Sequence, residues 1–178
     1  MFGYKLRCAL LAPPWLVVMR NRKQKVLVPI NPYICNILVD SCAFDPDDKN
    51  EAKASEVLFK NNRLIIMIAH SNMKEIEHPK TPDWVKQEAL SRIYTLETNL
   101  TPMEVAKKKE IHAILTGNGK PENMLKDAEH VFESHKYGCY FVTNDHRILK
   151  KREEIMSISN ALILRPTELL ESIENEYA

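Results

Sequence analysis

The stretch Ile34-Cys35-Asn36-Ile37-Leu38-Val39, followed directly by Asp40, decides the fold. It is apolar, partly β-branched and short, which is typical of a buried strand in a parallel sheet. Similar runs recur along the chain at Leu64–Ala69, Cys139–Thr143 and Ala161–Leu164. Because these runs alternate with helical segments, the sequence predicts an α/β fold with a central, mainly parallel sheet and helices on both faces.

The segments between the strands carry helix signals. Asp45-Pro46-Asp47-Asp48 is expected to begin a helix, rather than bind metal, and this helix should run to Lys60 with Ala54, Val57 and Leu58 on one face. Ser71 is expected to cap a short helix that contains Glu75. Two further helices are expected in an inserted region of about residues 80–120, and another from about Glu122 to His135, which Gly138 ends. A basic helix should begin near Asp145, and Pro166 should open the last helix.

The length of 178 residues fits one domain, which we place at residues 31–178 after an N-terminal extension of residues 1–30. The extension contains an apolar stretch, but it is interrupted by Pro13-Pro14 and is too short to span a bilayer, so we expect no membrane partner. The four cysteines are widely spread, which favours reduced thiols in an intracellular, cytoplasmic protein. The 25 basic and 24 acidic side chains nearly cancel, so any nucleic-acid binding would need a local basic patch.

Four acidic residues fall near one edge of the predicted sheet. Asp40 and Asp145 each follow a strand, Glu75 lies one helical turn past the second strand, and Asp127 lies early in a helix that leads into the third. Ligands of such sheets collect beyond the carboxyl ends of the strands. Clustered carboxylates repel one another, and a hard divalent cation relieves that repulsion, so Mg²⁺ or Mn²⁺ is the expected cofactor.

Other interpretations of these residues remain open. Asp40 and Asp145 are also suited to cap the turn or helix that follows each of them. Glu77 is an alternative to Glu75, but the two point about 200° apart on a helix, so only one should face the site. The histidines share no close ligand spacing and are interpreted as surface or structural residues.

Four motifs together resemble the PIN-domain nucleases. They are Leu38-Val39-Asp40-Ser41, Met73-Lys74-Glu75-Ile76, Asp127-Ala128 and Val142-Thr143-Asn144-Asp145, and they span roughly Ile34 to Leu170. The resemblance implies a three-layer α/β/α sandwich that hydrolyses RNA phosphodiester bonds with Mg²⁺ or Mn²⁺. It implies Asp40, Glu75, Asp127 and Asp145 as catalytic metal ligands, and Ser41, Thr143 and Asn144 as residues that shape the site.

The same resemblance suggests binding partners and bears on how many metal ions the site holds. Many PIN-like proteins are toxins of toxin–antitoxin pairs and others act in RNA maturation or decay, so RNA, an antitoxin and a second copy in a homodimer are the implied partners. Lys150, Lys151 and Arg152 are the expected RNA contacts, because their helix begins at the site. Some relatives carry a further acidic residue after the last aspartate, whereas this chain has His146-Arg147-Ile148-Leu149, so a second metal should be held less firmly.

Two functions of other classes compete with the nuclease. One is a nuclease-like fold that no longer cuts and serves as a binding module for RNA or protein. The other is a phosphatase or related carboxylate-metal hydrolase. A haloacid-dehalogenase-like enzyme would need Asp-x-Asp after the first strand, where this chain has Asp40-Ser41-Cys42, so we rank that function below the other two.

Overall fold

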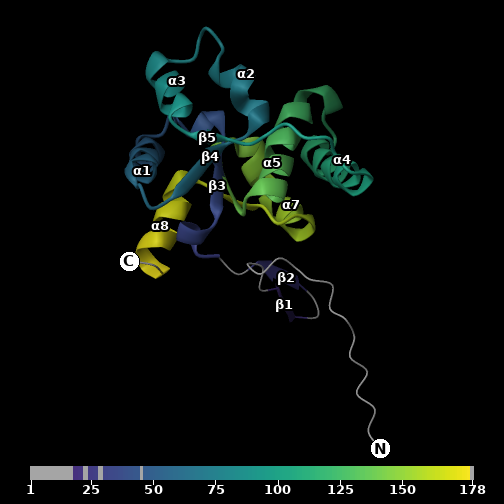
Figure 1. Cartoon of the computed structure of the whole chain (residues 1–178). Coiled ribbons are helices and arrows are strands. Elements are labelled where there is room, and N and C mark those ends of the chain that lie inside the picture. Colours follow the sequence, from purple (N-terminus) through teal and green to yellow (C-terminus); the bar gives the residue numbers. More distant parts are fainter. Residues whose placement is uncertain (1–17, 22–23, 28–29, 45, 177–178) are drawn as a thin grey trace, which may run out of the picture.

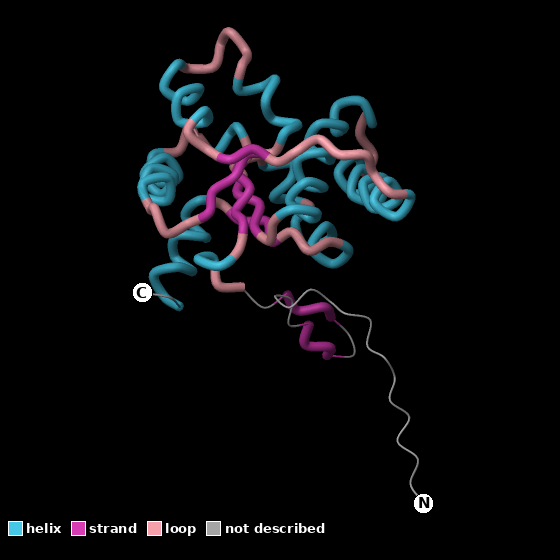
Figure 2. Tube along the Cα trace, in the orientation of Figure 1, coloured by secondary structure: helices cyan, strands magenta, loops and turns pink. Residues whose placement is uncertain are grey.

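The structure, a computed structural model, describes residues 18–21, 24–27, 30–44 and 46–176 (Figure 1). Most of the predicted extension of residues 1–30 lies outside this part, as does Asp45. Two short strands from the extension, β1 (Val18–Asn21) and β2 (Gln24–Leu27), pair antiparallel and form a sheet of their own (Figure 2). No described helix is long and apolar enough to cross a membrane.

The central sheet has five parallel strands in the order β5-β4-β3-β6-β7. Their bounds are β3 Asn36–Val39, β4 Ile65–Ile68, β5 Ile93–Tyr94, β6 Tyr140–Val142 and β7 Leu162–Leu164. The helices are α1 Lys49–Lys60, α2 Met73–Ile76, α3 Asp83–Leu90, α4 Pro102–Thr116, α5 Leu125–Tyr137, α6 His146–Lys150, α7 Arg152–Ile158 and α8 Pro166–Glu176. Four 3₁₀ turns complete the described elements: η1 Pro32–Ile34, η2 Ser41–Ala43, η3 His70–Asn72 and η4 Pro121–Met124.

Successive side chains of a strand point to opposite faces of the sheet, so the hydrophobic core has two layers. Ile37 and Val39 of β3 pack with Leu58 of α1 and Leu169 of α8 on one face of the sheet. Leu38, between them, belongs to the opposite core with residues of α4, α5, α6 and α7. Figure 1 shows α1 and α8 on one side of the sheet and α4, α5 and α7 on the other. The predicted three-layer α/β/α sandwich is therefore confirmed, and the central strands β3 and β6 are almost entirely buried because helices cover both faces.

The region of residues 80–120 is more than a helical insertion. Between α3 and α4 the chain forms β5, a two-residue strand at the sheet edge beside β4. So short a strand has no periodicity of its own, and only its pairing with β4 identifies it. The two helices predicted in this region are present as α3 and α4: Thr101 caps α4, and Glu104 completes a capping box.

Some local predictions were wrong. Val57 is 44% exposed, because α1 turns Ala54, Ser55 and Leu58 toward the core instead. The basic helix beginning at Asp145 divides into α6 and α7 at Lys151. Ser71 does not cap the helix that carries Glu75, for it lies inside η3, and its side chain makes no capping hydrogen bond.

Gly138 follows α5 at a point where the backbone passes close to β3. Gly138 does end the helix, but its backbone is extended (φ −136°) and not left-handed. A Cβ at this position would lie 2.6 Å from Leu38 Cδ1 and 2.9 Å from the carbonyl oxygen of Asn36. Glycine is therefore needed because the chain passes directly against β3 before it enters β6.

Candidate metal centre

The four predicted acidic residues lie at the carboxyl edge of the sheet. Asp40 directly follows β3, Asp145 caps α6 three residues after β6, Glu75 lies in α2 after β4, and Asp127 lies in the first turn of α5. Strands β3 and β6 are neighbours, and the strand order runs outward from them in both directions. This is the topological switch point of a doubly wound sheet, where ligands of such folds bind.

Asp40 is buried and surrounded by hydrogen-bond donors. Its Oδ2 accepts from Thr143 Oγ1 at 2.7 Å and from Cys42 Sγ at 3.2 Å, and its Oδ1 accepts from the backbone N–H of Ser41 at 2.8 Å. Burial alone raises the pKa of this carboxyl, but His130, Thr143 and Cys42 together lower the pKa below its ordinary value. Asp40 is therefore a carboxylate at neutral pH, and it also caps η2 as the alternative interpretation expected.

Glu75 joins Asp40 at the centre. Its Oε2 accepts from Ser41 Oγ at 2.9 Å, and its Oε1 lies 3.5 Å from Lys126 Nζ. One donor atom each from Asp40, Glu75 and His130 lie within 4.8 Å of one another, which is close enough for all three to bind one ion. Glu77 lines a separate hollow, so Glu75 is the glutamate that faces this cluster.

Asp127 and Asp145 form a second pair, which is bridged by Arg147. The Nη2 atom of Arg147 lies 2.5 Å from Asp145 Oδ2 and 3.2 Å from Asp127 Oδ2, and only the Asp145 contact has hydrogen-bond geometry. Burial raises the pKa of Asp127, and the negative charges of Asp145 and Asp40 raise it further, while Arg147 opposes them. The acidic quartet is thus split into two pairs: Arg147 offsets part of the charge of Asp127 and Asp145, and Asp40 and Glu75 lie with His130.

His130 was missed by the sequence interpretation, which assigned the histidines surface or structural roles. Its side chain is buried, with Nδ1 3.4 Å from Asp40 Oδ1, and no hydrogen-bond partner is found for Nε2 among the described residues. Burial lowers the pKa of the imidazole, but the negative charges of Asp40, Glu75 and Asp127 raise it above its ordinary value. The available signal was the spacing: His130 follows Asp127 by three residues, so both lie on one face of α5.

The predicted shaping residues hold the two pairs in place. Thr143 is fully buried, and its hydroxyl donates to Asp40 and accepts the backbone N–H of Asp145 at 3.0 Å. Ser41 connects to Glu75, and the backbone N–H of Asn144 donates to Cys42 Sγ at 3.2 Å. Both polar atoms of the Asn144 side chain are buried without a hydrogen-bond partner in the described part of the chain. Cys42 was not predicted; burial and the charge of Asp40 raise the pKa of its thiol, which remains a neutral donor.

Two of the three predicted RNA-binding residues form ion pairs. Arg152 Nη1 lies 2.8 Å from both carboxylate oxygens of Glu168, Lys151 Nζ lies 2.9 Å from Glu154 Oε1, and Lys150 is exposed. Lysines also lie beside Glu75. A hollow of about 390 Å³ borders Glu75, and Lys74, Lys80 and Lys126 line it.

The donor chemistry of the cluster fits a divalent cation. Two carboxylates and a buried imidazole converge, and His130 presents Nδ1 to Asp40 Oδ1 at 3.4 Å. Comparison with protein-family models and with curated protein sequences finds no match for this chain. The resemblance to PIN-domain nucleases therefore depends on the motifs and on the geometry of the centre itself.

Proposed function

We propose that this protein is a divalent-cation-dependent ribonuclease of the PIN-domain type. The observation that carries the proposal is the convergence of Asp40, Glu75 and His130 within 4.8 Å at the carboxyl edge of a doubly wound sheet. Asp127 and Asp145 lie beside this cluster and complete the acidic set implied by the motifs.

The side chains around the centre would prepare it for phosphodiester hydrolysis. Thr143 and Cys42 keep Asp40 ionised and fixed, and Ser41 orients Glu75. Mg²⁺ or Mn²⁺ bound between them would polarise a phosphodiester and lower the pKa of the attacking water. The guanidinium of Arg147 is more than half exposed and lies at the same edge, so it can contact a phosphate oxygen from outside the cluster.

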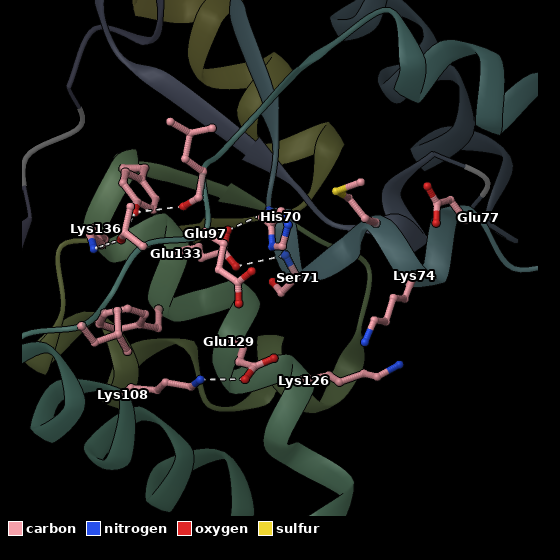
Figure 3. Close-up of a pocket in the computed structure, with 16 residues that line it drawn as sticks. His70, Ser71, Lys74, Glu77, Glu97, Lys108, Lys126, Glu129, Glu133 and Lys136 are labelled. Atoms are coloured by element: carbon pink, nitrogen blue, oxygen red, sulfur yellow. Dashed lines mark hydrogen bonds and ion pairs between the residues drawn. The ribbon is translucent and has the colours of Figure 1, made fainter.

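A chain of lysines beside the centre supports an anionic, extended substrate. Lys74 and Lys126 line both the 390 Å³ hollow next to Glu75 and a larger hollow of about 500 Å³. Figure 3 shows these two side chains extending toward one another at one end of the larger hollow. Successive phosphates of a single strand would follow such a line of cations, because phosphate contacts supply most of the affinity for nucleic acids.

The test is cleavage of a labelled single-stranded RNA by purified protein in Mg²⁺ or Mn²⁺, and again in excess chelator. We expect cleavage that the chelator abolishes and that falls at least a hundredfold in Asp40→Asn and Asp145→Asn. Asp48→Asn is the matched control, because Asp48 caps α1 away from the centre. Circular dichroism must show that each variant is folded. Cleavage that persists in a folded Asp40→Asn variant would exclude the mechanism.

The Arg147 bridge favours a second candidate, a binding module that does not cut. Arg147 offsets part of the negative charge of Asp127 and Asp145 without any metal. Such an arrangement is expected in a protein that keeps the fold of a nuclease but no longer binds a catalytic cation. In that case RNA would bind with an affinity that the chelator leaves unchanged, and no RNA would be cleaved. The cleavage assay and a filter-binding assay on the same RNA separate the two functions.

A further inference from the structure

His130 places a nitrogen donor in a centre that the sequence predicts to be purely acidic. The imidazole lies on α5, is 1% exposed, and presents Nδ1 to Asp40 Oδ1 at 3.4 Å. The proposed function counts this side chain among the converging groups but gives it no chemical role. Its role is therefore a separate question, although the answer concerns the cation of the proposed function.

A purely structural role leaves the imidazole poorly satisfied. Buried polar groups in proteins almost always have hydrogen-bond partners, and an unsatisfied one costs about 1–3 kcal/mol. No partner is found for His130 Nε2 in the described part of the chain, so no hydrogen bond through that nitrogen fixes the ring, and Nδ1 is the nitrogen that faces Asp40. The contact with Asp40 is also long at 3.4 Å, since charge-assisted N–H···O bonds are typically about 2.7–2.9 Å.

The same distance suits two ligands of one ion. Donor atoms about 2.1 Å from an octahedral cation, at the right angle between neighbouring ligands, lie about 3.0 Å apart, and a contact of 3.4 Å reaches this spacing by a small side-chain movement. The third donor, from Glu75, also lies within 4.8 Å of the other two. Hydrogen bonds from Thr143, Cys42 and Ser41 hold the two carboxylates from outside, which is the arrangement that orients the ligands of a metal site.

We propose that His130 is a direct ligand of the cation, so that Asp40, Glu75 and His130 form a mixed nitrogen–oxygen site selective for Mn²⁺ over Mg²⁺. Imidazole suits first-row transition metals, whereas Mg²⁺ takes oxygen ligands almost exclusively. One ion per chain is expected, because the guanidinium of Arg147 already lies between Asp127 and Asp145 and offsets part of their negative charge. This proposal deepens the proposed function but can be tested without any RNA.

The experiment uses the full chain, free of any histidine tag, with Mn²⁺ as the probe. Titration calorimetry should give one site that binds Mn²⁺ at least tenfold more tightly than Mg²⁺. Pulsed electron paramagnetic resonance should show ¹⁴N modulation of the bound Mn²⁺, and ¹⁵N-labelled histidine should replace it with the ¹⁵N signal. In His130→Gln the nitrogen signal should vanish and the preference for Mn²⁺ should shrink at least tenfold. His112→Gln on α4, outside the centre, should behave as the wild type.

Each outcome decides one of the two proposals. Bound Mn²⁺ without nitrogen modulation in the wild type overturns the role of His130, even if RNA is cleaved. Nitrogen modulation without any cleavage supports His130 as a ligand and counts against the nuclease. The labelled wild type alone can overturn the proposal, and the loss of its nitrogen signal in folded His130→Gln, or in His130→Asn if the glutamine variant does not fold, assigns the ligand to His130.

Discussion

The substitution Glu133→Gln tests how the helix that carries Glu75 is held. The carboxylate of Glu133, on α5, accepts the backbone N–H groups of His70 at 2.8 Å and Ser71 at 3.1 Å, and also the hydroxyl of Thr95. It caps η3 from a distant helix, whereas the sequence analysis expected Ser71 to cap the helix that carries Glu75. Because η3 leads directly into α2, this cap also positions Glu75.

The expected magnitude follows from the number of donors. A glutamine has the same shape but only one carbonyl oxygen. That oxygen can accept the two donors that bind Oε2 of Glu133, from His70 and Thr95, but it cannot also accept the N–H of Ser71, which binds Oε1. If the oxygen stays with His70 and Thr95, the amide NH₂ faces the N–H of Ser71, and that hydrogen bond is lost. A hydrogen bond to a charged group contributes about 1.5–3 kcal/mol. We expect the free energy of unfolding to fall by about that amount.

Urea unfolding at pH 7, followed by circular dichroism, measures the effect, and Glu129→Gln is the matched control. Glu129 lies one turn earlier on α5 and contacts Lys108 Nζ at 2.6 Å, with both side chains at least 30% exposed (Figure 3). Exposed ion pairs contribute only about 0–1 kcal/mol, so the control should change little. A Glu133→Gln variant no less stable than Glu129→Gln would refute the role of this cap. Because this cap positions Glu75, we also expect Glu133→Gln to bind Mn²⁺ more weakly than the wild type.

Three further predictions test other contacts. Arg147→Gln removes the cation between the two bridged aspartates, so calorimetry should reveal a second Mn²⁺ site in the variant, and an unchanged single site would contradict this. Gly138→Ala should lower the free energy of unfolding by about 1–3 kcal/mol, because its Cβ would lie 2.9 Å from the carbonyl oxygen of Asn36; a wild-type denaturation midpoint would show that the close approach does not matter. Burial raises the pKa of Glu168, but Arg152 and Arg165 together outweigh burial and the folded pKa is lowered from 4.5. This carboxylate therefore stabilises the fold above about pH 4.5, and the stabilisation is lost as pH falls through the folded pKa. Glu168→Gln should therefore destabilise the protein by about 1 kcal/mol at pH 7 and by less near pH 3, and denaturation curves showing the same difference at both pH values would oppose it.

The architecture followed from local patterns. Short apolar runs separated by helical segments predicted the parallel sheet, and the structure has β3, β4, β6 and β7 within those runs. Such patterns are readable because burial acts residue by residue along a strand or helix. The edge strand β5 was not predicted, since two residues carry too little pattern and only pairing with β4 defines them.

For the candidate centre, the sequence by itself determined which carboxylates reach one edge of the sheet, because parallel strands end on the same side. Only the tertiary structure decided how they are grouped: His130 beside Asp40, and Arg147 between Asp127 and Asp145. Likewise, it paired Arg152 with Glu168 and assigned the cap of η3 to Glu133. These contacts join different elements, many of them far apart in sequence, and depend on how helices pack and which rotamers fit. No local periodicity encodes that information.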